Sequence, residues 1–228
     1  KMEKYPGKEL EIFDKAIVFQ KYIYFLTKKF LKNKTLEVGA GLGSFTRNYF
    51  KEINDVSITE IDQNNFNILK EKFKNEKINI FSEKIQHIEG KFESIIYLNV
   101  LEHIESDLEE IDDALSKLCK GGYLIIVVPA HQELFTNFDR EIGHFRRYDK
   151  KFFNRNYNNA SIEKLIYIDA MGYFLYFLNK VIFTKETYPS SLKVQIWDKI
   201  FTPITILVDF ILGYKFGKNV LCVLKKTQ

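Results

Sequence analysis

The strongest constraint on the fold is a glycine-rich stretch near the N-terminus, Thr35-Leu36-Glu37-Val38-Gly39-Ala40-Gly41-Leu42-Gly43-Ser44. Its three glycines recur at every second position after a short apolar segment. Glycine tolerates positive φ and has no Cβ, so a bulky ligand can approach the main chain closely. A helical pattern begins at Ser44, and free amides at the start of a helix favour an anionic group. The stretch therefore predicts a nucleotide-type site at the carboxyl end of a first strand.

The spacing of the glycines indicates which nucleotide this loop binds. The dinucleotide fingerprint G-x-G-x-x-G/A is matched imperfectly, because its last position is occupied by Ser44. The pattern E-x-G-x-G-x-G, from Glu37 to Gly43, resembles motif I of the class I S-adenosylmethionine-dependent methyltransferases. That resemblance implies that the loop holds the methionine and ribose parts of S-adenosylmethionine, with S-adenosylhomocysteine as the product. The implied cofactor-binding residues are Glu37, Gly39, Ala40, Gly41 and Gly43.

An acidic residue follows the second predicted strand, which covers residues 56–62. Glu60 lies 17 residues beyond Gly43, close to the roughly 20-residue spacing of an acid that accepts both ribose hydroxyls. Each charge-assisted bond of this kind contributes about 1.5–3 kcal/mol. A solvated surface acid is the alternative. We expect Glu60 and its neighbour Ile61 to contact the cofactor.

A second block, Phe92–Ile104, is an apolar β-rich run that ends in Asn99 and continues as Leu-Glu-His-Ile. Such a run is typical of a strand buried on both faces. It resembles the fourth strand of the same family, and the sites of open α/β sheets gather at the carboxyl ends of their strands. We therefore expect Asn99 and Leu101 to contact the cofactor. The adenine-binding residue after the third strand stays open between Ser82 and Glu83.

The order of the motifs predicts one domain over residues 1–228. The turn Leu-Cys-Lys-Gly-Gly at residues 118–122 resembles the family's L-x-P-G-G turn, with lysine in place of proline, and leads into a fifth strand. The resemblance implies a Rossmann-like, doubly wound α/β fold with a seven-stranded, mostly parallel sheet. Its last strand, Val220–Leu224, is expected to run antiparallel between the fifth and sixth. Within the domain we expect a covering helix within residues 1–31, a substrate lid at 129–160 and a C-terminal part at 161–228.

Composition places the chain among globular proteins, because 46% of its residues are apolar and 15% aromatic. A net charge of +4 does not by itself indicate a nucleic-acid partner, and we expect none. Cys119 and Cys222 lie far apart in apolar surroundings, which is typical of reduced thiols in a cytosolic protein. We see no secretory signal and no uncharged apolar run of about 18 residues that could span a membrane. We expect a cytoplasmic protein, with a peripheral location at the inner face of the membrane as a variant.

The stretch from Pro129 to Tyr148 contains three of the five arginines and two of the four histidines. A long connection at this edge of the sheet is typical of a functional lid, and arginine suits capture of phosphate or carboxylate. Its Gly-His-x-Arg-Arg-Tyr segment resembles bacterial methyltransferases found beside glycosyltransferases of surface-polysaccharide pathways. We expect a small anionic acceptor, such as a sugar, nucleotide sugar or glycolipid precursor. The expected acceptor-binding residues are Arg140, His144, Arg146, Arg147 and Tyr148. The alternative is that Arg140 and Arg147 pair with Asp139, Glu141 or Asp149 and fix the loop.

Methyl transfer to a hydroxyl benefits from a general base. His103 and His131 each follow a strand at the site edge, and neutral imidazole is available near pH 7, so both are catalytic candidates, with His144 third. No paired spacing of His, Cys or Asp predicts a closed metal site, so we expect no metal.

The C-terminal part contains an apolar helical segment, Ser191–Leu212, interrupted at Pro203. Its apolar face predicts core packing, a homodimer contact or a contact with the membrane surface. Two rival functions stay open: an NAD-dependent sugar oxidoreductase and a non-catalytic protein that binds S-adenosylmethionine.

Overall fold

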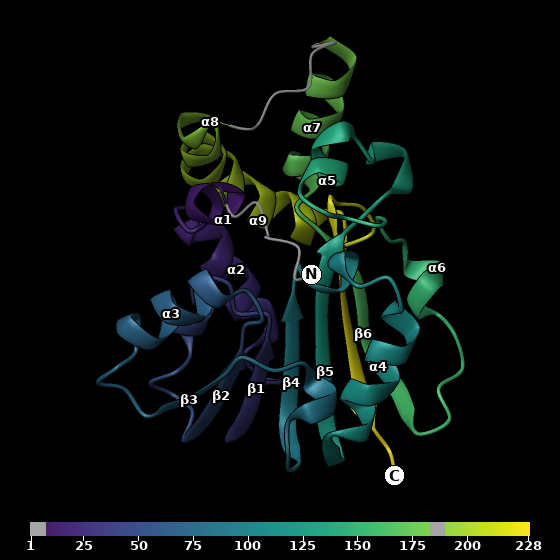
Figure 1. Ribbon diagram of the computed structural model, residues 1–228. Coiled ribbons are helices and arrows are strands. Elements are labelled where there is room, and N and C mark those ends of the chain that lie inside the picture. The colour runs from purple at the N-terminus through teal and green to yellow at the C-terminus, as the bar shows by residue number, and fades with distance from the viewer. Residues whose placement is uncertain (1–7, 183–189) are drawn as a thin grey trace.

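The computed structural model describes residues 8–182 and 190–228. A seven-stranded sheet with the order β3-β2-β1-β4-β5-β7-β6 forms its centre. Figure 1 shows the strands rising together toward a group of helices at one end. The strands are β1 (Lys34–Val38), β2 (Asp55–Thr59), β3 (Ile78–Phe81), β4 (Phe92–Leu98), β5 (Leu118–Pro129), β6 (Ala160–Ile168) and β7 (Asn219–Lys226).

Strand directions match the prediction. The strands from β3 to β5 pair in parallel, whereas β7 pairs antiparallel with both β5 and β6. The chain reverses to the second half of the sheet at the β1–β4 boundary, so the carboxyl ends of β1 and β4 form the switch point where open α/β sheets bind ligands. The expected seven-stranded sheet with an inserted antiparallel last strand is confirmed.

Helices cover both faces of the sheet. Residues of α2 (Ile17–Thr27) and α3 (Gln63–Lys72) belong to one buried cluster with alternate side chains of the central strands. Residues of α4 (Asp107–Ser116) and α6 (Lys150–Phe153) belong to the cluster on the opposite face. The central strands are buried on both faces because their runs are continuously apolar.

The N-terminal helix differs from the prediction, because the described part of the expected single helix is divided into α1 (Lys8–Phe13) and α2. Asp198, far along the chain, accepts hydrogen bonds from the amides of Val18 at 3.0 Å and Phe19 at 2.8 Å. Its carboxylate thus caps the start of α2, although the apolar pattern of the sequence continues across this position without a break. The break follows from this tertiary contact.

A second difference concerns the segment after the glycine loop. The helix expected from Ser44 is a short 3₁₀ turn, Thr46–Asn48. The Thr46 hydroxyl donates a hydrogen bond to the buried Glu37 carboxylate at 2.7 Å, which holds this turn down against β1. The expectation of an α-helix with an amide-rich start was therefore wrong here.

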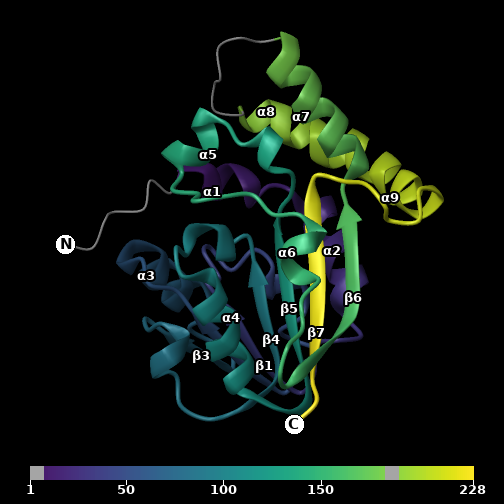
Figure 2. The same cartoon turned by 90° about the vertical axis from the view of Figure 1, so that its right-hand side faces the viewer.

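The remaining helices lie above the carboxyl ends of the strands (Figures 1 and 2). The predicted lid contains α5 (Asn137–Glu141) and α6, and β6 leads into α7 (Ala170–Ile182). The expected interruption near Pro203 is present: α8 (Ser191–Ile196) passes through a π-helical turn, Trp197–Phe201, into α9 (Thr202–Ile211). Among the described helices, none combines the length and apolarity needed to cross a bilayer.

Candidate active site

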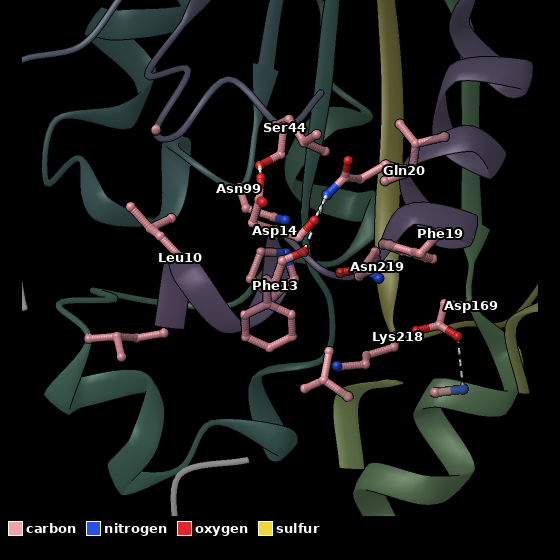
Figure 3. Close-up of a pocket in the computed structure, with 18 of the residues that line it drawn as sticks. Leu10, Phe13, Asp14, Phe19, Gln20, Ser44, Asn99, Asp169, Lys218 and Asn219 are labelled. Carbon is pink, nitrogen blue, oxygen red and sulfur yellow. Dashed lines mark hydrogen bonds between the residues drawn. The ribbon is translucent and has the colours of Figure 1, made fainter. Parts of the chain in front are cut away.

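A cavity of about 560 Å³ opens at the carboxyl ends of the strands. Such a volume falls within the range of roughly 300–1,000 Å³ that is typical of sites for small molecules. The glycine loop, α1, α2, the ends of β4 and β5, and the helices α5, α7 and α8 all contribute lining residues. Figure 3 shows side chains from α1 and α2 close to Asn99 and Asn219, which follow β4 and begin β7. The predicted glycine loop and the predicted lid therefore meet in one cavity.

The glycine loop has the backbone geometry that its sequence requires. Gly39, Gly41 and Gly43 have φ values of 68°, 57° and 70°, a region that other L-residues rarely adopt. A Cβ on Gly39 would lie 2.7 Å from Cγ2 of Val100, and one on Gly43 would lie 2.6 Å from the Phe73 ring. The loop thus packs directly against the segment that follows β4. Of the expected loop residues, Gly39, Ala40 and Gly41 line the cavity and Gly43 does not.

Glu37 supports this loop from within β1. Its carboxylate accepts hydrogen bonds from the hydroxyls of Thr46 at 2.7 Å and Tyr49 at 2.6 Å. Burial raises the pKa of Glu37 to about 7, although the two hydrogen bonds act against that rise. Glu37 also lines the cavity, so it can fix the loop and face a ligand.

Glu60 follows β2, and both of its carboxylate oxygens accept hydrogen bonds from the main chain. They accept hydrogen bonds from the amides of Gly41 at 2.9 Å and Asp62 at 2.9 Å. Burial raises the pKa of Glu60, and these amide bonds act in the opposite direction. A carboxylate has about four acceptor positions, so it can accept further bonds, but Glu60 is not among the residues that line the cavity. Glu60 is connected to the cofactor loop, and its contact with ribose stays a prediction.

The other expected cofactor residues are distributed between the cavity and its surroundings. Asn99 lines the cavity with a positive φ of 53°. Ile61 is 57% exposed beside Glu60, where it could cover one face of a planar ring. Leu101 is buried in the core on the α4 side of the sheet, where it packs beneath the chain that follows β4.

A polar wall of the cavity is formed by Glu102, His103 and His144. Burial raises the pKa of Glu102 to about 7 and lowers the pKa of His103 to about 3, with the neighbouring His144 adding to the second effect. The rings of the two histidines lie edge to face at 4.6 Å. His103, one of the two expected catalytic residues, therefore lies in the cavity as a neutral imidazole.

Asp139 organises the lid side of this wall. Its carboxylate accepts a bidentate pair of bonds from Nε and an NH2 group of Arg147, both at 3.0 Å, and contacts Nδ1 of His144 at 2.9 Å. Burial acts to raise the pKa of Asp139, but the bonds from His144 and Arg147 hold it well below its usual range. Arg147 and His144 both line the cavity. The alternative in which Arg147 pairs with Asp139 and fixes the loop is thus realised.

Several residues expected at the acceptor lie outside the cavity. Arg146 pairs with Asp107 at 2.7 Å, and the buried Tyr148 hydroxyl donates to the same carboxylate at 2.9 Å. Arg140 is exposed and donates to the side chain of Asn137 at 2.8 Å. Because these partners come from α4 and the lid itself, the three side chains stabilise the connection.

His131 also lies outside the cavity. Its ring is stacked on Tyr167 at 5.0 Å, and its Nε2 lies 3.0 Å from the carbonyl oxygen of Gly217. Its φ of 67° turns the side chain toward β6 and the chain before β7. Of the two expected catalytic histidines, the structure brings only His103 to the cavity.

Some lining residues carried no sequence signal. Asp169, with a φ of 67°, and Lys218 meet at the far end of the cavity, as Figure 3 shows. Burial raises the pKa of Asp169 and lowers that of Lys218, and each charge opposes the effect on the other. Asp14, which follows α1, and Gln20 of α2 also line the cavity. None of these residues belongs to a recognisable sequence motif, and only the folded chain brings them to one cavity.

Comparison with known proteins agrees with this geometry. Residues 11–161 match a family described as a methyltransferase domain. A search of curated proteins gave no match.

Solved structures share the fold at low sequence identity. The N-methyltransferase NodS from Bradyrhizobium japonicum, in complex with S-adenosylhomocysteine, is 11% identical with a TM-score of 0.58, covering 100% of this chain and 91% of that one. Coclaurine N-methyltransferase is 12% identical with a TM-score of 0.60, covering 92% and 72%. Magnesium protoporphyrin IX methyltransferase from Synechocystis is 12% identical with a TM-score of 0.56, covering 93% and 83%. The family match, the sheet topology and the glycine loop lead to one conclusion: this chain belongs to the methyltransferase-domain family and is an enzyme of the class I, S-adenosylmethionine-dependent type.

Proposed function

We propose that the enzyme methylates an oxygen or nitrogen atom of a small acceptor bound between the glycine loop and the polar wall. The observation that carries this proposal is a single cavity lined by Gly39, Asn99 and His103 together. Because a Cβ on Gly39 would touch Val100, the cofactor loop and the segment that leads to the polar wall are in direct contact. An acceptor on that wall therefore lies beside the cofactor.

The residues present fit the cofactor. Gly39 and Gly41, which both have positive φ, line the cavity, and Asn99 and Glu37 offer polar groups beside them. S-adenosylmethionine supplies an electrophilic methyl group on a sulfonium. The protein's contribution is alignment, which can supply about 7–11 kcal/mol of the barrier. Leu10, Phe13 and Phe19 of α1 and α2 make one side of the cavity apolar.

The acceptor that we propose is a small sugar-like molecule with an anionic group, such as a nucleotide sugar or glycolipid precursor. Lys218 supports the anionic group, because it places an amine in the cavity wall, although the neighbouring Asp169 offsets part of its charge. Arg147 is engaged by Asp139 and serves this purpose less well than the sequence indicated. Carboxylates and imidazoles in the polar wall would accept hydrogen bonds from hydroxyl groups.

A lipid-linked acceptor is favoured by the surface of α8 and α9. Leu207, Phe210 and Ile211 are 60%, 71% and 69% exposed. Every exposed charged side chain between residues 190 and 215 is a lysine, since Asp198 and Asp209 are buried. Exposed apolar side chains together with lysines in the same segment favour an anionic membrane surface. We propose peripheral contact with the inner face of the membrane as the cellular location.

Titration calorimetry with S-adenosylhomocysteine and NADH tests the cofactor, and transfer of a labelled methyl group to nucleotide sugars and lipid-linked sugars tests the acceptor. We expect binding of S-adenosylhomocysteine alone and labelling of at least one acceptor class. NADH binding without a response to S-adenosylhomocysteine would contradict the proposal in favour of an oxidoreductase. Cofactor binding without transfer to either acceptor class would favour a non-catalytic protein.

A further inference from the structure

We propose that Glu102, His103 and His144 form a binding site for one divalent transition-metal ion of the Zn²⁺ type in the wall of the cavity. One ligand atom from each of these side chains lies within 4.8 Å of the other two. Two of the three residues are adjacent in the chain after β4, and the third comes from the lid. The sequence spacing of His, Cys and Asp indicated no metal site. His144 is far from the other two residues in sequence and joins them only in the folded chain.

The state of Glu102 is the second observation. Its side chain is fully buried and lines the cavity. Neither carboxylate oxygen receives a hydrogen bond from another residue of the described chain. A buried carboxylate that accepts no hydrogen bond destabilises the folded chain. Oε1 lies 3.9 Å from Nε2 of His144, so a cation between these two atoms would give the carboxylate its missing partner.

His144 is oriented as a metal-binding histidine usually is. Its Nδ1 lies 2.9 Å from Asp139, so this nitrogen carries the proton and Nε2 presents its lone pair toward Glu102. Metal-bound histidines almost always donate the other ring N–H to a carboxylate or a carbonyl. Asp139 is itself held by Arg147 and by the amide and hydroxyl of Thr136. The ring is thus fixed before any ion arrives.

His103 is supported in a comparable way. The main chain of Gly143 forms a hydrogen bond with it, and a Cβ on Gly143 would lie 3.6 Å from its Nδ1. Gly143 has a φ of 87°, so the turn that brings the lid to this histidine uses the freedom of glycine. Both imidazoles therefore have one nitrogen directed to a supporting group.

The ligand set selects the class of ion. Two imidazole nitrogens and one carboxylate occur in catalytic zinc sites, which keep a fourth position for water or substrate. Mg²⁺ and Ca²⁺ prefer oxygen ligands alone. Metal–ligand bonds of about 2.0–2.1 Å require ligand atoms roughly 3.3 Å apart in a tetrahedral site. The ligand atoms of this set lie within 4.8 Å of one another, so the side chains must rotate inward to complete the site.

A metal here would act on the acceptor, and this step depends on the proposed methyl transfer. A hydroxyl bound at the open position becomes more acidic and gives its proton to solvent water. Its oxygen lone pair then forms the bond to the methyl carbon while the electrons of the C–S bond return to sulfur. His103 would serve as a ligand in this arrangement and not as a general base.

The test is calorimetric titration of the full chain, free of affinity tags and treated with a chelator, with ZnCl₂. We expect one ion per chain, and affinity at least tenfold lower in Glu102→Gln and His144→Gln, consistent with the tenfold to hundredfold losses typical of disturbed metal sites. His87→Gln is the matched control, since His87 is exposed and distant in sequence from the set. MgCl₂ should give no saturable binding. Cobalt(II) should give visible d–d bands in the wild type and lose them in Glu102→Gln.

Melting temperature and S-adenosylhomocysteine affinity show whether each variant is folded. Absence of zinc binding in the wild type, or equal affinity in the wild type and in folded Glu102→Gln, would overturn the metal site. S-adenosylhomocysteine binding by the metal-free chain tests the proposed function separately. If the wild type binds zinc but not S-adenosylhomocysteine, the result would contradict the proposed function and would still support the metal site.

Discussion

Glu60 connects the second strand to the glycine loop, and its loss should weaken cofactor binding. Glu60→Ala removes the acceptor for the Gly41 amide and any bond to ribose. We expect S-adenosylhomocysteine affinity to fall at least tenfold, the equivalent of one strong hydrogen bond. Calorimetry measures this, with the exposed Glu76→Ala as control. Unchanged affinity would exclude Glu60 from the site.

Glu37 should make stability depend on pH. Its folded pKa is about 7 against an ordinary 4.5, so folding favours the protonated carboxyl. The contribution to stability is complete below pH 4.5 and is lost as the pH rises toward 7. Relative to Glu37→Gln, the wild type should lose up to about 1.4 kcal/mol per pH unit in this window. Urea unfolding of both proteins at several pH values checks this, and parallel stability curves would contradict it.

Individual residues were predictable from sequence where the chemistry is local. The loop at Gly39 and Gly41 and the strand-end residue Asn99 lie where the motif placed them, because backbone conformation and strand position are set by neighbouring residues. The lid arginines were not, because whether Arg147 meets a substrate or Asp139 depends on tertiary packing. The sequence of an arginine-rich segment does not show which carboxylates pair with it.

Among the elements, the lid depends on the buried pair of Arg147 and Asp139. Removing one partner of a buried ion pair costs about 3 kcal/mol. For a chain of this size that corresponds to roughly 6–12 °C in melting temperature. We therefore expect Arg147→Ala to lower the melting temperature far more than Arg140→Ala, whose side chain is exposed. Equal shifts in differential scanning calorimetry would contradict a structural role for Arg147.

The start of α2 depends on Asp198 of the π-helical turn. Its carboxylate accepts the amides of Val18 and Phe19, so Asp198→Ala leaves both donors without that acceptor. We expect a loss of about 1–2 kcal/mol, measured by urea unfolding. Asp198→Asn keeps one acceptor oxygen and should lose less. An equal loss in Asp198→Asn and Asp198→Ala would show that charge, and not capping, decides the effect.

Element boundaries were less predictable than element types. The apolar pattern of the N-terminal segment runs through the break before Ile17, and nothing local marks it, because the cap comes from Asp198. The interruption before Pro203 was predictable, since proline lacks an amide and constrains the preceding turn. Breaks caused by the residue itself can be found in sequence, and breaks caused by a distant partner cannot.

For the whole molecule, the order of the strands followed from the order of the motifs. Parallel strands joined by helices pack with one handedness, so a glycine loop after β1 and a polar segment after β4 must share one edge of the sheet. The same reasoning could not place the helices above that edge. Their position depends on packing of α7 and α9, whose sequences show only that they are apolar.

The exposed apolar surface of α8 and α9 gives a prediction about the intact protein. We expect it to sediment with vesicles that contain phosphatidylglycerol and to bind less at high salt, because both apolar burial and lysine charge contribute. Phe210 is 71% exposed, and burying its ring would contribute about 1.5–3 kcal/mol. Phe210→Glu should therefore lower vesicle affinity by about tenfold or more.

The matched control is Ile68→Glu, which introduces the same charge at a position 48% exposed on α3, away from α8 and α9 (Figure 1). It should leave vesicle binding unchanged. Equal binding to zwitterionic vesicles would contradict the role of the lysines. A dimer in light scattering without vesicles, lost in Phe210→Glu, would instead assign this surface to a second copy of the chain. The two outcomes differ because a dimer depends on protein concentration and vesicle binding depends on lipid concentration.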